Sequence, residues 1–139
     1  MKLCEVKIGR TEQIRHKVTE ADVELFASTS GDTNPLHLDE AYARKSRFGE
    51  RIAHGMFAAN FFSGIFGTKF PGPGCLYVGQ SLKFRKPILI GDTIDVSVIV
   101  KQVHHRKRVI EFSTKCTVDG TPVITGSADI YIPVEMEDK

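Results

Sequence analysis

The segment from His54 to Phe70, HGMFAANFFSGIFGTKF, constrains the fold of this chain more than any other. Its apolar residues fall on nearly every helical face, which is typical of a buried helix. Proline and glycine alternate over residues 71–74 and end the helix firmly. Gly64 and Gly67 each cost about 1 kcal/mol of helix propensity, so we expect close packing to offset this cost. The rest of the chain must therefore form a layer around this helix.

After this helix the sequence predicts a run of strands. Apolar and polar residues alternate with the period of a half-buried strand over residues 76–84, 94–100, 110–118 and 124–132. In the first of these strands the alternation places Leu76, Val78, Leu82 and Phe84 on one face. Asp119-Gly120, between the last two strands, is a hairpin signal. These strands are expected to pair as antiparallel neighbours.

The first third of the chain combines a strand region with short helices. Residues 3–18 predict one or two short strands, broken near Gly9. Thr19 then begins a helix with a capping box that involves Asp22, and Gly31 ends that helix. A short helix follows over residues 39–46, capped by Asp39. The order of elements indicates the α+β class, in which helices are segregated from the strands.

The simplest packing of these elements is one curved antiparallel sheet with the long helix in its concavity. Such a sheet leaves an open edge, and open edges commonly pair with a second subunit. We therefore expect a homodimer or a dimer of dimers.

Composition excludes several classes of protein. A chain of 139 residues predicts one domain over residues 1–139. The net charge of +2 gives no strong electrostatic case for nucleic acid or membrane as a partner. Cys4, Cys75 and Cys116 lie far apart without a CxxC pair, which argues against a disulfide framework or a zinc site and favours a reducing, cytoplasmic setting. The N-terminal residues predict no signal peptide, and no apolar stretch reaches the length of a membrane span.

Two ionisable side chains, Asp32 and His37, stand in the connection between the first two helices. They lie within the stretch FASTSGDTNPLHLDEAYA, residues 26–43. Asn34-Pro35 cannot continue a helix, because the residue before proline favours extended geometry. A carboxylate and an imidazole in a kinked loop without regular hydrogen bonding suit proton transfer. Taken singly, Asp32 also fits an Asx turn and His37 a surface hydrogen bond.

The start of the long helix offers a second chemical group. The first N–H groups of a helix have no intrahelical partner, and Gly55 has no side chain to keep another molecule away from its N–H. A donor at a positive helix end is the geometry of an oxyanion hole. The alternative is that Gly55 only eases a tight turn. His54 is interpreted as a helix-start residue rather than a catalyst, and no GxSxG motif surrounds Ser63 to make it a nucleophile.

The remaining polar motifs are less informative. His104 and His105 are neighbours in an extended or turn region, so they are poor joint metal ligands. The basic run KQVHHRKR at residues 101–108 predicts a solvated turn, with a phosphate contact as the alternative. The sequence contains no P-loop and no GxGxxG, so neither ATP nor NAD is implied.

The connection between the first helices forms one motif, Phe26-x-x-x-Ser30-Gly31-Asp32-x-Asn34-Pro35-Leu36-His37-x(5)-Ala43. It resembles the hydratase signature of the MaoC-like family, with no departure in the core motif. HGM at residues 54–56, FFSGIFG at 61–67 and YVGQSLKFRKPILIGD at 77–92 also resemble that family. The similarity spans nearly the whole chain, and the closest group looks like the (R)-specific enoyl-CoA hydratases.

This resemblance implies a hot-dog fold, in which an antiparallel sheet wraps around a long helix, and a homodimer with substrate tunnels near the subunit interface. It implies reversible addition of water to trans-2-enoyl thioesters such as acyl-CoA substrates, giving (R)-3-hydroxyacyl thioesters. By position it carries the catalytic pair to Asp32 and His37, and the backbone donor for the thioester carbonyl to Gly55. Ser63 matches a polar residue near the site, and Asn34 is expected at its substrate-binding part.

The implied reaction agrees with the chemistry of the residues. Charge builds on the thioester oxygen as water adds to C3, and one N–H donor such as that of Gly55 is typically worth about 3 kcal/mol there. We assign His37 as the base on water and Asp32 as the group that returns a proton to C2, although the roles can be exchanged because the pair titrates as a unit. No metal or redox cofactor is needed.

Phe66 can share a helix face with Ser63. Its side chain either shortens the acyl pocket, which would favour substrates with short acyl chains such as crotonyl, or packs in the core.

Three other functions are alternatives to a hydratase. A hot-dog thioesterase would use a carboxylate near the central helix, where this chain has Asn60 and Ser63. A non-catalytic acyl-CoA-binding module would keep the fold alone, and the intact Asp32/His37 pair argues against it. A nucleic-acid function would rest on the basic run at residues 101–108 alone.

Overall fold

The computed structural model describes residues 1–138. Its strands are β1 (Thr11–Lys17), β2 (Leu76–Phe84), β3 (Thr93–His104), β4 (Val109–Val118) and β5 (Thr121–Tyr131). Its helices are α1 (Glu20–Ser30), α2 (Pro35–Leu38), α3 (Glu40–Arg44) and α4 (Gly55–Thr68), with 3-10 turns η1 (Leu3–Glu5) and η2 (Val134–Asp138). The strands form one antiparallel sheet in the order β1-β3-β4-β5-β2. The predicted turn at Asp119-Gly120 joins β4 to β5, with both residues at positive φ, 49° and 79°.

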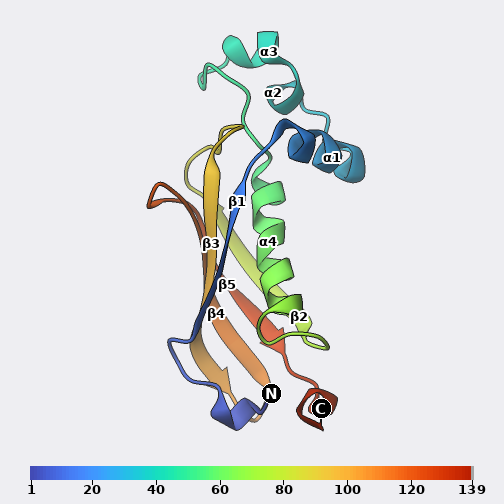
Figure 1. Cartoon of the computed structure of the whole chain (residues 1–139), viewed down its shortest axis with the longest axis vertical. Helices are drawn as coiled ribbons and strands as arrows, with labels where there is room; N and C mark the ends of the chain where they lie inside the picture. The colour runs from blue at the N-terminus through green and yellow to red at the C-terminus, as the bar shows by residue number, and fades with distance from the viewer. Residues whose placement is uncertain (139) are drawn as a thin grey trace.

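Helix α4 runs along the sheet, as Figure 1 shows. One side of α4 is buried, and its core residues are Phe57, Ala58, Ala59, Phe62, Ile65 and Phe66. They meet the inward side chains of the central strands, such as Val96, Val98 and Phe112, which are fully buried. This is the α+β, hot-dog arrangement that the resemblance implied. Within residues 1–138 no helix combines the length and the apolarity that crossing a bilayer requires.

The opposite side of α4 is open to solvent in the single chain. Met56 is 56% exposed, and Asn60, Ser63, Gly64 and Gly67 are also exposed. A Cβ atom added at Gly64 or Gly67 would meet nothing within 4 Å. The expectation that close packing surrounds these glycines and that α4 is covered on all sides is therefore wrong for the single chain, because the sheet covers only one side of the helix.

The single apolar face predicted for β2 is also wrong. Leu76 and Val78 are 55% and 62% exposed, Leu82 is half-buried, and Phe84 lines the cavity described below. The register shift between Tyr77 and Gly79 interrupts the alternation, so Leu76 pairs with Tyr131 while Phe84 pairs with Ile124 on the other face of β5. β2 also lies at the edge of the sheet and pairs with β5 alone.

The N-terminal residues differ from the expected strand. Only Thr11–Lys17 forms a strand, and Leu3–Glu5 forms a 3-10 turn. The Leu3 N–H donates to Glu137 Oε1 at 2.7 Å, and the Leu3 side chain is buried. This contact with the far end of the chain is tertiary, so local alternation could not predict it.

The short helices gather at one end of the molecule, beside the N-terminal end of α4, while both termini lie at the other end (Figure 1). The predicted caps are present: the Thr19–Asp22 capping box begins α1, and Asp39 accepts a hydrogen bond from the Tyr42 N–H at 3.0 Å. The expected irregular loop around His37 is instead the short helix α2. Asn34 Oδ1 accepts from the Leu36 N–H at 3.0 Å and caps α2, whose first residue is Pro35.

Candidate active site

Asp32 follows directly on the end of α1. Gly31 ends that helix in the left-handed conformation, with φ of 78°. The Asp32 N–H donates to Ser30 Oγ at 3.0 Å, and Asp32 Oδ1 accepts from the Asn34 N–H at 3.2 Å. The Asx turn is thus present. It engages one carboxylate oxygen, and Oδ2 makes no hydrogen bond to any of residues 1–138. The carboxyl group is exposed and free to contact a water or a substrate.

His37 is held by its neighbours on two sides. Its Nδ1 lies 2.7 Å from the carbonyl oxygen of Ile52, and because a carbonyl only accepts, Nδ1 carries the proton. The Nε2 atom therefore keeps its lone pair. Arg51 fixes the backbone: its Nε donates to the His37 carbonyl at 2.7 Å and its Nη1 to Glu20 Oε1 at 2.7 Å. Although only 8% of His37 is exposed, it lines the cavity described below.

His54 lies against His37 at the start of α4. The two rings are stacked, with centroids 3.9 Å apart and planes inclined by 29°, and the ring of Phe26 lies 4.8 Å away. The Nε2–H of His54 donates to the Asp32 carbonyl at 3.1 Å, and Nδ1 is buried with no partner among the described residues. Burial lowers the pKa of His54, and the neighbouring His37 acts in the same direction, against the opposing hydrogen bond to Asp32.

Sequence reasoning placed His54 at the helix start, and it is the N-cap residue of α4. The sequence did not predict its contacts with Asp32 and His37, nor the hydrogen bond from Arg51 to the His37 carbonyl. A local motif gives no distance between residues 32, 37 and 54. The one available signal was that His54 directly precedes Gly55, which had already been singled out.

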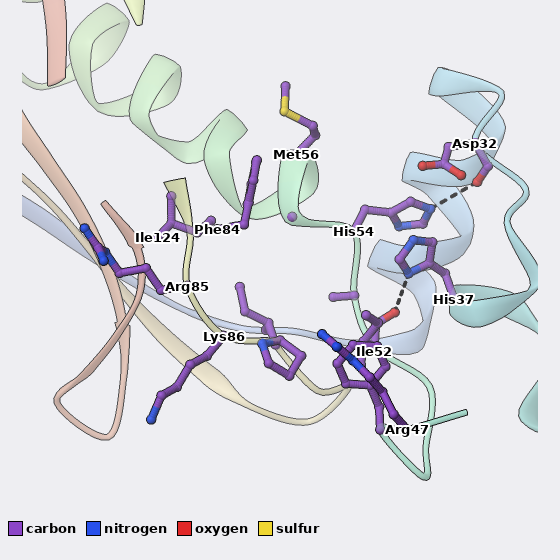
Figure 2. A pocket seen from close by; sticks show the side chains of 15 residues that line it. Asp32, His37, Arg47, Ile52, His54, Met56, Phe84, Arg85, Lys86 and Ile124 are labelled. Carbon is purple, nitrogen blue, oxygen red and sulfur yellow. Dashed lines mark hydrogen bonds between the residues drawn. The ribbon is translucent and has the colours of Figure 1, made fainter. Parts of the chain in front are cut away.

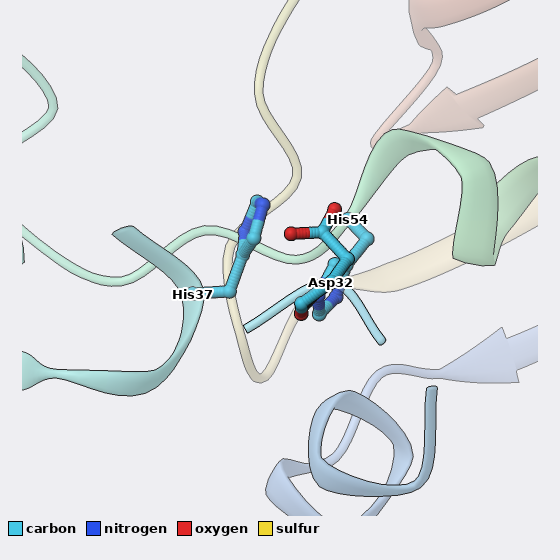
Figure 3. Close-up of side chains that lie close together, drawn as sticks. All are labelled: Asp32, His37 and His54. Atoms are coloured by element: carbon cyan, nitrogen blue, oxygen red, sulfur yellow. Dashed lines mark hydrogen bonds between the residues drawn. The ribbon is translucent and has the colours of Figure 1, made fainter. Parts of the chain in front are cut away.

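Asp32, His37 and His54 form one cluster (Figure 3). One ligating side-chain atom from each residue lies within 4.8 Å of the others. A single water can bridge such a span, because two hydrogen bonds of about 2.8 Å each reach farther. Stacked imidazoles do not aim their in-plane lone pairs at one point, which disfavours a shared metal ion. Because Nε2 of His54 is bonded to the Asp32 carbonyl, the atoms left to hold a water are the Asp32 carboxylate and Nε2 of His37.

Gly55 is required by its surroundings. A Cβ atom at this position would lie 2.5 Å from Cδ1 of Phe84, closer than such atoms can approach. The Gly55 N–H is the first of α4 and has no acceptor within residues 1–138. A free donor at a positive helix end is therefore available beside the acid/base cluster.

These groups line a cavity of about 340 Å³ (Figure 2). Its polar and charged side chains come from Asp32, His37, His54, Arg47, Arg85 and Lys86. Its apolar wall includes Ile52, Ala53, Met56, Phe84, Pro87, Ile88 and Ile124. An apolar cavity that also presents an acid/base pair, a backbone donor and three cations fits a ligand with an apolar part and an anionic part.

Three other predicted site residues lie outside the lining of this cavity. Asn34 caps α2 and so supports the helix that carries His37. Ser63 is exposed on the open side of α4. Phe66 is 1% exposed, with its ring 4.6 Å from that of Phe112 and 5.4 Å from that of Tyr77.

Comparison with known proteins agrees with this fold. Residues 5–121 match the family model described as MaoC like domain. An (R)-specific enoyl-CoA hydratase from Rhodospirillum rubrum is 45% identical over 129 residues, covering 93% of this chain and 90% of that protein. A 3-hydroxybutyryl-CoA dehydratase from Methylorubrum extorquens is 38% identical over 133 residues, covering 96% and 85%. The chain belongs to the MaoC-like family, which confirms the resemblance seen in its sequence.

A solved structure shows the same fold. The (R)-hydratase from A. caviae involved in PHA biosynthesis superposes with a TM-score of 0.90 at 35% identity, covering 93% of this chain and 98% of that one. The predicted hot-dog fold is therefore confirmed.

Proposed function

We propose that this protein is an (R)-specific enoyl-CoA hydratase in which Asp32 and His37 supply the acid/base chemistry. The activities of its relatives, an enoyl-CoA hydratase and a 3-hydroxybutyryl-CoA dehydratase, support the reaction class, a hydro-lyase that adds or removes water. One observation carries the assignment of the pair: the Ile52 carbonyl binds Nδ1–H of His37 at 2.7 Å. That bond leaves the basic Nε2 free in the cavity that Asp32 also lines.

The reaction begins with a water held between the two side chains. His37 Nε2 takes a proton from the water as its oxygen attacks C3 of the trans-2-enoyl thioester. Electrons move through the conjugated system to the thioester oxygen, which becomes enolate-like. Asp32 in its protonated form then gives a proton to C2, and proton exchange with solvent restores the pair. Dehydration is the same path reversed, and the roles of Asp32 and His37 can be exchanged because the pair titrates as a unit.

Gly55 stabilises the charge that develops on the thioester oxygen. Its N–H is free within the described chain and stands at the positive end of α4. One donor of this kind typically lowers a barrier by about 3 kcal/mol. Asn34 contributes by capping α2, which holds His37 in place.

Coenzyme A is the thioester carrier that the cavity fits. Arg47, Arg85 and Lys86 line it, and none of the three forms an ion pair with a carboxylate in residues 1–138. The guanidinium of Arg47 lies over the ring of Phe48, and Arg85 donates to Thr125 Oγ1 at 2.7 Å. Cations without carboxylate partners in the lining of an apolar cavity are suited to the phosphates of coenzyme A.

The active form that we propose is a homodimer or a dimer of dimers. The edge strand β2 exposes Leu76 and Val78, which lie outside the cavity lining. An unpaired edge with apolar side chains favours pairing with a second copy. In such an assembly Ser63, on the open side of α4, would become part of a covered surface near the site.

The proposed setting is the cytoplasm, without a nucleic-acid or membrane partner. Cys4, Cys75 and Cys116 are all free thiols, which supports a reducing environment.

A direct assay separates hydration from the two alternative functions. Purified protein is incubated with crotonyl-CoA while the conjugated enoyl absorbance is followed, with a thiol reagent in a parallel sample. A hydratase removes conjugation without releasing thiol, a thioesterase releases thiol, and a binding module does neither. Loss of absorbance without thiol is the expected result, and thiol release would overturn the proposal.

The residue assignment is tested with matched variants. Asp32→Asn and His37→Asn should each lower kcat by about 10²-fold or more, because each removes an acid/base group. Asp119→Asn and His105→Asn make the same chemical changes at exposed turn positions outside the cavity and should keep full activity. Full activity in either site variant, with its oligomeric state unchanged, would reject that residue as a catalyst.

A further inference from the structure

His54 is the most constrained polar side chain of the site. It is 2% exposed and lies between the ring of Phe26, 4.8 Å away, and the ring of His37, 3.9 Å away. Its Nε2–H donates to the carbonyl of Asp32. One side chain thus contacts both members of the proposed acid/base pair, which belong to different elements.

The hydrogen bonding defines the protonation state of this ring. A carbonyl accepts only, so the contact with Asp32 requires the proton on Nε2. Nδ1 is then an unprotonated nitrogen, and it is buried without a partner among the described residues. A proton added there would be a buried donor without an acceptor.

We propose that His54 is the positioning residue of this site: its uncharged ring fixes the Asp32 backbone and the His37 ring relative to each other and supports the positive charge that His37 gains in the reaction. This inference rests on the proposed hydratase function. His54 presents almost no surface to a ligand, so it acts through its two neighbours.

The charge argument follows from the stack. When His37 takes a proton from water, a cation stands 3.9 Å from the face of the His54 ring. A neutral aromatic face attracts such a cation, whereas a charged His54 would repel it. The groups that face His54 are Asp32 and His37, with Phe26 on the remaining side. The Asp32 carboxylate is exposed, and only its carbonyl bonds to His54.

Two substitutions separate the functions of the ring. His54→Phe keeps an aromatic face against His37 and loses the hydrogen bond to Asp32. His54→Gln keeps a donor and loses the aromatic face. Each should lower kcat for crotonyl-CoA about tenfold with little change in KM, the size expected from one lost hydrogen bond or cation–ring contact. His104→Gln, at a half-buried histidine outside the cavity, is the control and should keep kcat within about twofold of the wild type.

Nitrogen NMR of the histidine rings gives a readout that does not depend on activity. At pH 6.5, where a free imidazole is about half protonated, His54 should remain neutral with its proton on Nε2. The Ile52 carbonyl should keep a proton on Nδ1 of His37 in both the wild type and His54→Gln. The His37 ring signals should broaden in His54→Gln, because the ring has lost the stacked partner that limits its motion. A role limited to folding would lower stability without changing the His37 signals.

The outcomes are distinct. A protonated His54 at pH 6.5, a proton on its Nδ1, or unchanged kcat in both folded variants would overturn the inference. If the wild type hydrates no enoyl thioester while the NMR results hold, the positioning of the pair stands and the proposed reaction fails.

Discussion

His37 and His54 are stacked imidazoles with their protons on opposite nitrogens. The Ile52 carbonyl holds the proton of His37 on Nδ1, and the Asp32 carbonyl holds that of His54 on Nε2. At a centroid separation of 3.9 Å the two rings cannot both be charged without strong repulsion. Of the two rings, His37 is the one with an unprotonated Nε2 in the cavity, so it is the ring placed to take a proton from a bound water.

The lowered pKa of His54 makes stability depend on pH. Burial holds the pKa of the folded state below the ordinary value of about 6.5. Between that value and the lowered pKa, the unfolded chain binds a proton that the folded chain does not, so the free energy of unfolding falls as pH is lowered from about 6.5. Urea unfolding of wild type and His54→Phe at pH 7.5 and 5.5 measures this, and the variant should lose less stability over the same interval. An equal loss in both proteins would show that His54 does not contribute.

Arg51 should affect catalysis although it does not face the cavity. It donates to the His37 carbonyl and to Glu20, so Arg51→Ala releases the backbone of α2. We expect kcat to fall about tenfold and KM to change little, since a charge-assisted hydrogen bond contributes about 1.5–3 kcal/mol and only part of it acts on the site. Steady-state kinetics with crotonyl-CoA measure the effect. Arg44→Ala is the control, because Arg44 pairs with Glu40 on the exposed surface of α3; an equal loss in both variants would contradict the assignment.

The contact between Gly55 and Phe84 predicts a rescue. Gly55→Ala would place a Cβ 2.5 Å from the Phe84 ring, so either the ring or the start of α4 must move. We expect at least about a tenfold loss of kcat from a displaced oxyanion donor. The double variant Gly55→Ala/Phe84→Ala removes the clash and should recover activity relative to Gly55→Ala, as a double-mutant cycle would show. A double variant no better than the single one would mean that the clash is not the cause.

Removing a positive charge from the cavity should weaken substrate binding and so raise KM. Arg47→Ala and Lys86→Ala should each raise KM for crotonyl-CoA about two- to fivefold, the range expected for partly solvated charge pairs, with kcat unchanged. A crotonyl thioester of pantetheine without its phosphates should show no such change. Arg106→Ala, in the turn between β3 and β4, is the control. A larger effect on crotonyl carrier protein than on crotonyl-CoA would assign these cations to a protein carrier instead.

Phe66 tests the preference for short acyl chains. Its ring, on α4, packs against those of Phe112 and Tyr77 outside the cavity lining, and Phe66→Leu opens space there. We expect the ratio of kcat/KM for octenoyl-CoA to that for crotonyl-CoA to stay within about twofold of the wild-type ratio, because a substitution in the core does not lengthen the cavity. A rise of about tenfold, the size expected for a methylene accommodated in an apolar pocket, would show instead that Phe66 limits the acyl pocket.

Local signals in the sequence predicted the elements well. The capping box of Thr19, the Gly31 stop, the Asp39 cap and the Asp119-Gly120 turn all occur as expected, since each depends on residues close in sequence. The period of apolar residues also gave the correct type for α4 and for the strands after it. In these elements the local backbone preferences and the pattern of apolar side chains favour the same secondary structure.

Coverage by other layers was the part that the sequence did not reveal. The apolar residues of α4 predicted a helix covered on every side, and those of β2 a half-buried strand. Only the topology of the sheet shows that one chain leaves one side of α4 and residues Leu76 and Val78 uncovered. The contacts within the site were likewise visible only in the three-dimensional structure. Asp32, His37 and Gly55 were chosen from local chemistry, whereas the stack of His54 on His37 and the tie from Arg51 are contacts across the fold.

The Ile52 carbonyl, which sets the tautomer of His37, belongs to a residue that also pairs with the connection between β2 and β3. Ile52 forms an isolated bridge with Leu89, and the next N–H, that of Ala53, donates to the Ile88 carbonyl at 2.7 Å. The connection between β2 and β3 thus anchors the acceptor of the catalytic imidazole. Residues 89–92 of that connection lie outside the cavity lining. Substitutions there can move the Ile52 carbonyl, and with it the orientation of the His37 ring, without changing any side chain of the cavity.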